Sequence, residues 1–392
     1  MLVEWSVMMN KSVGFCGTRG IPANYGGFET AVDEITKILS EQNVDCHVFG
    51  RSKPNESITV DKRKTIYVQG SSSRKLDTFV SSINTGLYLL KHRKEYEFVF
   101  WFNNANLPGI ILTKLAGIPM AVNTDGLEWK RAKWSWPFKL YYFLSSMLIC
   151  FMCKTLISDA QAIQNYYKRV FKKRTQMIPY GAPEIQKINE TSINETLEGF
   201  GVEKDKYFLQ ITRFEPDNLP LEIIDSFYKS KMSDEGYKYV VIGYKESSPY
   251  ADAVKAYSKY RGIIVLPALY DKEKLQILRE NAICYVHGNS VGGTNPALLE
   301  AMASCKRVLA IDVEFSKEVI GDYGLLFKKG NITKRFREVL KMEDQSSAMK
   351  IRLSNKYQWD AVAKAYFSLV TSSTTNYFKE LHKEEVLDLS VL

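Results

Sequence analysis

The stretch Ser290-Val291-Gly292-Gly293-Thr294-Asn295-Pro296-Ala297-Leu298-Leu299-Glu300 decides the fold of this chain. The apolar run from Ile283 to His287 before it predicts a buried strand, and the run from Pro296 to Ala303 after it predicts a helix. A glycine-containing loop between a strand and a helix leaves backbone N–H groups free at the helix N-terminus, where an anion binds well. The stretch therefore predicts an anion-binding loop in an α/β domain.

A second glycine-rich loop lies near the beginning of the chain, from Gly17 to Glu29. It follows a predicted strand, Ser12 to Cys16, and it opens an amphipathic helix from about Gly27 to Glu41. The pair Gly26-Gly27 allows close approach of a phosphate because glycine has no Cβ. The spacing matches neither the dinucleotide fingerprint nor the P-loop. We favour a ligand-facing loop, because ligands bind at the carboxyl ends of parallel strands; an ordinary turn is the alternative.

Strand-like and helix-like runs alternate along the chain, which predicts two Rossmann-like α/β domains facing each other across a cleft. Further strands are predicted at 45–50, 65–68, 98–102, 121–124, 155–158, 175–178, 207–212, 239–243, 263–266 and 308–311. We place the domain boundary in the polar stretch from Pro183 to Glu203. The predicted division is an N-terminal domain over 1–190 (with 1–10 disordered), a C-terminal domain over 191–354, a helix over 355–371 that packs back on the N-terminal domain, and a tail over 372–392.

Charge is distributed unevenly over the 392 residues. Residues 1–190 contain 25 Lys and Arg against 16 Asp and Glu, whereas the remainder is neutral. A basic half indicates an acidic partner, such as membrane phospholipid, nucleic acid or a phosphorylated substrate. The six cysteines are scattered through apolar segments, which indicates reduced core residues of a cytosolic protein, and the N-terminus shows no signal peptide. No Asp-x-Asp pair and no histidine cluster occurs, so we expect neither a metal nor a cofactor.

The segment from Trp129 to Lys139 mixes aromatic and basic side chains. Tryptophan suits a bilayer interface, and cations suit anionic headgroups. The apolar run from Leu140 to Cys153 is too short to span a bilayer and predicts a core helix. We therefore expect peripheral attachment to the inner face of the cell membrane through Trp129–Lys139, with an ordinary basic surface as the alternative. Nucleic acid is not expected, because no nucleic-acid-binding module is present.

Three polar residues lie at the end of a predicted strand or directly after it. Arg213 lies past the strand 207–212, and its guanidinium could donate two parallel hydrogen bonds to a diphosphate, although a surface salt bridge is the alternative. Asp125 either holds an acceptor hydroxyl or forms a turn with Gly126. His287 either faces a leaving phosphate or is an ordinary loop residue.

Together these stretches resemble the family-4 retaining glycosyltransferases of the GT-B fold. The narrower resemblance is to the bacterial rhamnosyltransferases that build capsule and other cell-surface polysaccharides. The stretches that carry it are Gly17 to Pro22, Tyr25 to Glu29, Asn123 to Arg131, Gly292 to Pro296 and Leu298 to Met302.

The resemblance implies roles for individual residues. The donor-binding set is Gly26, Gly27, Arg213, Leu269, Gly293, Thr294, Asn295, Pro296 and Glu300. In it, Glu300 would bind the nucleotide ribose, Leu269 would lie against the base, and Arg213 would neutralise the diphosphate as a catalytic residue. Asp125 is the second catalytic candidate. The residues expected on the acceptor side or in the cleft are Arg19, Tyr25, Asn123, Asp125 and His287.

The sequence departs from the wider family at three positions. Gly292 replaces the first Glu of the Glu-x7-Glu motif, Asn218 replaces a Lys, and Asp125-Gly126 stands where a His often occurs. These changes suit a donor sugar with a different hydroxyl pattern. The resemblance implies transfer of a sugar, L-rhamnose from dTDP-rhamnose being the expected donor, to a hydroxyl of a lipid-linked glycan. A nucleotide-sugar epimerase, a non-catalytic nucleotide-sugar-binding member and a dinucleotide oxidoreductase remain alternatives.

Overall fold

The computed structural model describes residues 11–23, 26–51, 57–73, 76–131, 134–243 and 248–374. The chain forms two units. The first consists of Met1–Trp129, Trp136–Gly181 and Lys356–Leu392, and the second of Lys130–Ser135 and Ala182–Asn355. The second unit thus begins before the boundary expected at residue 190, and it includes a short segment from within the first half of the chain.

The first unit is built on an eight-stranded sheet in the order β3-β4-β2-β1-β5-β6-β7-β8. Its strands are β1 (Ser12–Cys16), β2 (Cys46–Arg51), β3 (Ser57–Val60), β4 (Arg63–Val68), β5 (Tyr96–Phe102), β6 (Met120–Asn123), β7 (Thr155–Ser158) and β8 (Gln176–Met177). All neighbours pair in parallel except β3 and β4. The central strands β1 and β5 are almost wholly buried, as expected for parallel strands covered on both faces.

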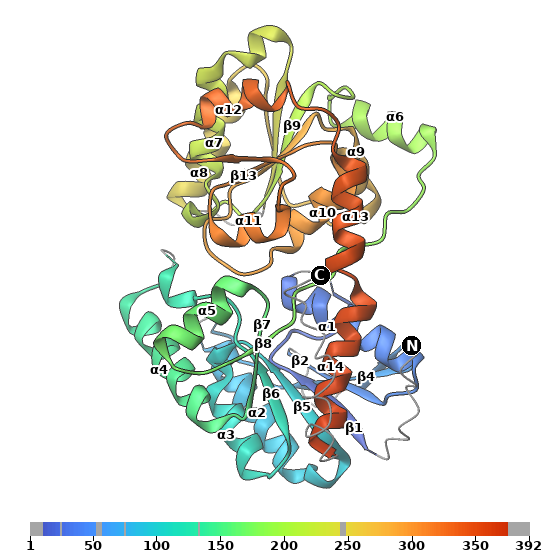
Figure 1. Cartoon of the computed structure of the whole chain (residues 1–392), viewed down its shortest axis with the longest axis vertical. Coiled ribbons are helices and arrows are strands. Elements are labelled where there is room, and N and C mark those ends of the chain that lie inside the picture. The colour runs from blue at the N-terminus through green and yellow to red at the C-terminus, as the bar shows by residue number, and fades with distance from the viewer. Residues whose placement is uncertain are drawn as a thin grey trace. The chain divides into compact units, whose positions relative to one another are not determined.

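Helices cover both faces of this sheet. They are α1 (Gly27–Glu41), α2 (Asp77–Lys91), η1 (Arg93–Glu95), η2 (Asn104–Asn106), α3 (Leu107–Leu115), η3 (Glu128–Lys130), α4 (Trp136–Met152), α5 (Gln161–Val170) and α14 (Trp359–Thr374). Right-handed crossovers place α2 to α5 on one face and α1 on the other, where α14 packs against it (Figure 1).

The last helix, α14, belongs to the first unit although it follows the second unit in sequence. The Tyr366 hydroxyl accepts a 3.0 Å hydrogen bond from Nδ2 of Asn123, and its ring stacks on Phe102. Gly181 leaves room for the indole of Trp359, which a Cβ at that position would overlap. The helix begins four residues later than the predicted 355–371, because α13 (Ser346–Lys356) ends just before it.

The second unit contains a six-stranded, wholly parallel sheet in the order β11-β10-β9-β12-β13-β14 (Figure 1). Its strands are β9 (Tyr207–Ile211), β10 (Lys238–Ile242), β11 (Ile263–Leu266), β12 (Cys284–His287), β13 (Val308–Ile311) and β14 (Leu325–Phe327). Its other helices are α6 (Glu190–Gly199), η4 (Pro216–Asn218), α7 (Pro220–Ser230), η5 (Met232–Glu235), α8 (Pro249–Lys255), η6 (Ala256–Lys259), α9 (Lys272–Asn281), α10 (Pro296–Ser304), α11 (Glu314–Ile320) and α12 (Ile332–Val339). The predicted strands are confirmed, and β3 and β14 are additional.

The polar stretch predicted as a linker contains a helix, α6. Its N-cap, Asn189, accepts a 2.8 Å hydrogen bond from the backbone N–H of Ser192. Only Thr196 and Leu197 of this helix are buried. The segment therefore lacks the repeated apolar residues by which an amphipathic helix is predicted from sequence.

The six cysteines are buried and form no disulfide. Burial raises the pKa of Cys150 to about 12 and of Cys153 to about 11, so both remain thiols and suit a core better than a zinc or redox site. In the part of the chain that the structure describes, no helix has both the length and the apolar character needed to cross a membrane. The expected disorder of residues 1–10 and most of the expected tail lie outside the described residues.

Helices α2 and α3 approach each other closely through small residues. Oγ of Ser82 donates a 2.9 Å hydrogen bond to the carbonyl of Asn106 and accepts one of 2.9 Å from the N–H of Gly109. A Cβ at Gly86 would lie 3.0 Å from Cα of Gly109. The glycines therefore set the separation of these two helices.

Replacing Gly109 with alanine should lower the free energy of unfolding of the first unit by about 1–3 kcal/mol, since the added Cβ would overlap the ring of Trp101 and the carbonyl of Ser82. The matched control is Gly199→Ala in α6, where an added Cβ meets nothing within 4 Å. There we expect no loss, or a gain of about 0.5–1 kcal/mol. Urea unfolding followed by circular dichroism measures both, and equal stabilities would contradict the packing argument.

Candidate functional site

Two loops meet at the carboxyl edge of the second sheet. Strands β9 and β12 pair in parallel, so the loop that carries Arg213 and the glycine loop that precedes α10 leave the sheet side by side. Both the backbone N–H and Oγ of Ser290 donate to the carbonyl of Asp217, at 2.8 Å each. Oγ1 of Thr212 donates to Oδ1 of Asn289 at 3.3 Å. The structure thus brings together the two motifs that the sequence analysis placed in one site.

Arg213 is partly accessible at this edge. Its side chain is 34% exposed, and Nη1 lies 3.7 Å from Oε1 of Glu215. The salt-bridge alternative is therefore present, but the pair is long and leaves donors of the guanidinium available. The backbone carbonyl of Arg213 accepts a 3.0 Å hydrogen bond from Nδ2 of buried Asn218, the residue that replaces the lysine of the wider family. Asn218 thus holds the arginine loop instead of adding a charge.

The N-terminus of α10 is capped by its own residue. The side chain of Asn295 accepts a 3.0 Å hydrogen bond from the N–H of Ala297, and Pro296 has no N–H. The preceding loop, which includes Gly293 and buried Thr294, is therefore better suited to meet an anion with its backbone than the helix terminus is. Gly292 has φ +151°, a backbone conformation in which the glutamate of the wider family would be strained.

Glu300 is paired with an arginine that the sequence analysis missed. Nη2 of Arg279 donates to Oε2 of Glu300; Arg279 is buried on α9, and Glu300 is half-buried on α10. In sequence, Arg279 belongs to a strongly charged helix, and such a residue ordinarily faces solvent. The flanking buried pair Ile277 and Leu278 was the signal that this end of α9 turns inward. Leu269 lies half-buried in the loop after β11.

His287 is the last residue of β12 and is buried. It is therefore a strand residue, and the ordinary-loop alternative is wrong. Burial lowers the pKa of His287 to about 3, so its imidazole is neutral near pH 7 and supplies no positive charge to a phosphate.

A second polar cluster lies at the carboxyl edge of the first sheet. Asp125 has φ +59° and forms the expected turn, its Oδ1 accepting a 2.7 Å hydrogen bond from the N–H of Gly126. Its Oδ2 accepts one of 3.0 Å from Nδ2 of Asn103, at the end of β5. Oδ1 of Asn123 accepts a 3.1 Å bond from the N–H of Asp125. Asp125 thus forms the turn and also contributes its carboxylate to the polar cluster.

More carboxylates surround this cluster. Burial raises the pKa of Tyr180 well above its ordinary value, and the nearby carboxylates of Asp159, Asp125 and Glu29 raise it further. The sequence analysis missed Asp159, which follows β7 directly. An edge rich in carboxylate and amide groups is suited to sugar hydroxyls rather than to phosphate, since it would repel a second anion.

The first glycine loop already holds an anion of the protein. Oε1 of Glu29 accepts a 3.3 Å hydrogen bond from the N–H of Arg19, and a Cβ at Gly26 would overlap Oε2 of the same carboxylate. Gly26 (φ +110°) is the N-cap of α1, which begins at Gly27. Burial raises the pKa of Glu29, against the lowering effect of its own N–H and of Arg19 and Arg51. Tyr25 lies outside the described residues.

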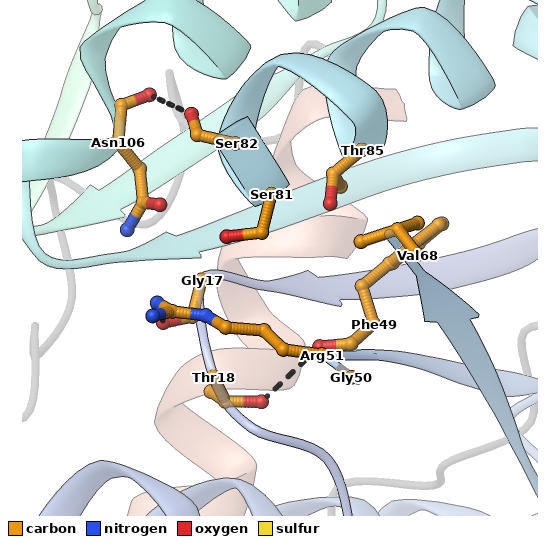
Figure 2. Close-up of a pocket in the computed structure, with 10 residues that line it drawn as sticks. All are labelled: Gly17, Thr18, Phe49, Gly50, Arg51, Val68, Ser81, Ser82, Thr85 and Asn106. Carbon is orange, nitrogen blue, oxygen red and sulfur yellow. Dashed lines mark hydrogen bonds between the residues drawn. The ribbon is translucent and has the colours of Figure 1, made fainter. Parts of the chain in front are cut away.

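A narrow pocket lies beside this loop, with about 170 Å³ of empty space including the part open to solvent (Figure 2). Arg51 crosses it: Nη2 donates to the carbonyl of Gly17 at 3.2 Å, and Nη1 donates to Oγ1 of Thr78 at 2.9 Å and lies 3.3 Å from the carboxylate of Asp77. Small-molecule pockets are ordinarily about 300–1,000 Å³. With its guanidinium so engaged, Arg51 acts as a support of the loop.

Two further expectations concern a metal site and the membrane contact of the segment Trp129–Lys139. Among the described residues no group of three or more His, Cys, Asp or Glu side chains is placed to hold a metal ion. In the predicted membrane segment, Trp129 is partly buried and packs against Phe143, Tyr166 and Phe171 inside the first unit. Trp136 is exposed, and Lys133 lies outside the described residues.

Comparison with known proteins covers nearly the whole chain. Residues 10–183 match a family model described as a domain of unknown function, DUF1972, and residues 194–356 match the model described as glycosyl transferases group 1. No curated protein matches the sequence.

Several solved structures are similar to this chain over more than nine-tenths of its length. A sucrose-phosphate synthase from Thermosynechococcus elongatus has a TM-score of 0.75 at 15% identity, covering 93% of this chain and 99% of that one. A glycosyltransferase from Rickettsia africae ESF-5 has a TM-score of 0.69 at 12% identity, covering 94% and 100%. An E. coli structure described as trehalose-6-phosphate bound with UDP-2-fluoro glucose has a TM-score of 0.66 at 10% identity, covering 92% and 98%.

The fold class predicted from the sequence is therefore confirmed. The match over the second unit supports sugar transfer as the activity, whereas family 4 and the rhamnosyltransferase branch remain predictions. Residues 194–356 are similar to the glycosyl transferases group 1, and the chain as a whole has the GT-B fold.

Proposed function

We propose that this chain transfers a sugar from a nucleoside diphosphate donor to a hydroxyl of a lipid-linked glycan, at the cytoplasmic face of a bacterial membrane. L-rhamnose from dTDP-rhamnose is the proposed donor, with retention of the anomeric configuration. The observation that carries the proposal is the hydrogen-bonded pair of loops after β9 and β12, which sets Arg213 beside the glycine loop. The UDP-2-fluoro glucose bound in the similar E. coli structure supports this class of donor.

In this proposal the donor is held by the second unit. Arg213 and the backbone N–H groups of Gly293 to Asn295 bind the diphosphate, and they stabilise the charge that develops on it as the glycosidic bond breaks. Cationic and amide donors replace a metal ion in that role. Glu300 binds the ribose through the carboxylate oxygen that Arg279 leaves available, and Leu269 covers one face of the base.

The acceptor hydroxyl is proposed to interact with the carboxylate and amide groups of the first unit, namely Asp125, Asn123 and Asn103, with Arg19 nearby. The departing diphosphate then takes the proton of that hydroxyl, since the buried, neutral His287 is poorly placed to exchange protons.

Two positions bear on which sugar is transferred. Gly292 and Asn218 stand where, by the resemblance, the wider family has a carboxylate and an ammonium group. A donor sugar with fewer hydroxyls, or with hydroxyls at other positions, would not need these two charged groups. The same observation favours one second candidate function, binding of a nucleotide sugar without turnover.

The proposal is tested by incubating the purified chain with a panel of nucleoside diphosphate sugars and a lipid-linked acceptor. Transfer from dTDP-rhamnose, with release of dTDP, is the expected result. Binding in calorimetry without release would favour the non-catalytic function, and an epimerised sugar formed from donor alone would favour an epimerase.

The substitution Arg213→Ala should lower turnover by about tenfold to a thousandfold, because it removes a donor that stabilises the charge of the leaving group. Steady-state kinetics at saturating donor measures the effect. The control is Arg261→Ala, which removes an exposed arginine from a loop of the same unit and should leave turnover unchanged. If both variants behave like the wild type, Arg213 has been placed wrongly.

The substitution Glu300→Ala should weaken donor binding by about tenfold or more, since a charged group donates or accepts stronger hydrogen bonds than a neutral one. It should also lower the free energy of unfolding by about 1–3 kcal/mol, because the buried guanidinium of Arg279 loses its partner. The double variant Arg279→Met with Glu300→Ala separates the two effects. We expect stability to recover and donor affinity to stay low; recovery of affinity would show that Glu300 acts only through Arg279.

Burial of neutral His287 should make stability fall on mild acidification. Below its ordinary pKa of about 6.5 the unfolded chain binds a proton that the folded chain excludes until about pH 3. Between about pH 7 and about pH 5.5 the wild type should therefore lose about 1 kcal/mol more than His287→Gln. Urea unfolding at a series of pH values measures the difference, and parallel curves would contradict the burial of a neutral imidazole.

A further inference from the structure

Helix α4 carries apolar side chains on its outer surface. Its 17 residues include a single charged side chain, Lys139. Leu140, Leu144, Leu148 and Phe151 form one stripe at helical spacing, and all four are exposed, Phe151 by 80%. An ordinary surface helix carries polar residues on that side, and a helix that is apolar all round is ordinarily covered. The stripe is therefore a surface that lacks a cover in the described chain.

Helix α2 buries several small or polar residues and exposes several large apolar ones, which is the reverse of an ordinary surface helix. The residues that it buries include Ser81, Ser82, Thr85 and Gly86, whereas Phe79, Leu87 and Leu90 are among those that it exposes. Small residues allow the close approach to α3 described above, a packing mode that is common where the outside of the helix is also apolar.

Helix α3 connects these two stripes into one surface. It packs closely against α2 and also contacts α4. Its outward residues Ile111 and Leu115 are exposed, Leu115 by 70%. Figure 1 shows α2, α3 and α4 together on one side of the first sheet. We call the outward side chains of these three helices the apolar face. Contiguous exposed apolar surface of this kind marks a site of interaction with a protein or a membrane.

Cations border the apolar face at one end. The helices run antiparallel to the strands, so α2 to α5 all finish at the edge where the strands begin. Lys91 ends α2 and is followed by Arg93 and Lys94. Lys114 lies in the last turn of α3, and Lys154 follows α4; all five side chains are exposed. Beyond them lie Lys168 and Arg169 of α5 and the loop residues Lys172 and Arg174, also exposed.

Favourable interaction with helix dipoles accounts for a cation in the last turn of each helix. The helix dipole does not explain the cations that continue past the helix ends. It also does not explain why these cations lie beside Leu115 and Phe151, the most exposed apolar residues of the face. Only Glu95 and Glu97 oppose these charges in the segment after α2. Lipid headgroups that carry negative charge complement this combination, with acyl chains meeting the apolar side chains.

A second copy of the chain is a poorer occupant. A two-fold interface brings the same patch of each copy together, so it would gather the cations of both borders in one interface.

We propose that the apolar face docks on an anionic lipid bilayer, with its cationic border on the headgroups and Trp136 at the interface. This deepens the proposed function, because a lipid-linked acceptor lies in such a surface. It also moves the contact from the segment Trp129–Lys139, of which only the Trp136 end is part, to the outward sides of three helices.

Co-sedimentation of the full chain with vesicles tests the proposal without donor or turnover, so its outcome is independent of the sugar transferred. The wild type should bind vesicles of phosphatidylcholine mixed with phosphatidylglycerol, more weakly at high salt, and bind pure phosphatidylcholine much less. The double variant Leu148→Glu with Phe151→Glu should lower the partition coefficient by at least about tenfold. Lys168→Gln with Arg169→Gln should lower it by about fivefold per cation removed.

The matched control is Ile351→Glu, which places the same charge at an exposed apolar residue on α13 of the second unit. It should bind vesicles like the wild type, and circular dichroism should show that all variants fold. Absence of wild-type binding, equal binding to both kinds of vesicle, or an unchanged partition coefficient in the Leu148 and Phe151 variant would overturn the proposal. So would a lower oligomeric state of that variant without vesicles, which would identify a second copy as the occupant.

Discussion

The proposed donor side of this protein depends on one backbone carbonyl, that of Asp217. It accepts two hydrogen bonds from Ser290 and so ties the loop after β9 to the loop after β12. Parallel pairing brings the two strand ends to the same edge, but it does not set the distance between the loops that follow. The Asp217–Ser290 contact does, and Asn218 holds the arginine loop from behind. The loop that carries Arg213 and the glycine-rich loop are thereby held beside each other before any ligand is present. Such preorganisation is what stabilisation of a leaving diphosphate requires.

The two units offer different chemistry at the carboxyl edges of their sheets. The second unit presents Arg213 and a loop of backbone N–H groups, which are suited to phosphate. The first presents Asp125, Asp159 and Glu29 around Tyr180, which are suited to hydroxyls. Such a division is what transfer of a sugar from a diphosphate to an alcohol needs, because the two substrates differ most in charge. The carboxylate of Glu29 at the N-terminus of α1 is the clearest sign that the first loop is not a simple phosphate loop.

The apolar face and the close packing of α2 on α3 have a common origin. Serine, threonine and glycine on the inner side of α2 bring it near α3, and Phe79, Leu87 and Leu90 of the helix are directed outward, whereas Leu89 is buried. In a chain that meets only water this arrangement would be unfavourable, since burial of apolar surface is the main driving force of folding. It becomes favourable if a lipid surface covers the outward side.

From the sequence alone, the alternation of strands and helices, the GT-B fold and the pairing of the Arg213 loop with the glycine loop could be predicted, because parallel strands bring sequentially distant ends to one edge whatever the details of packing. The helix in the polar stretch before residue 200 could not, since too few of its residues are buried to leave a period. Arg279 had only an indirect signal, the apolar pair Ile277 and Leu278 before it, which does not identify its partner. Asp159 was beyond reach, because a single charged residue carries no sign of burial until its neighbours in space are known. The tertiary structure alone decided that Glu300 pairs with Arg279, that His287 is buried and neutral, and that Trp129 faces inward while the leucines of α4 face outward. Each of these depends on contacts between segments far apart in the chain, and local patterns of residues do not specify such contacts.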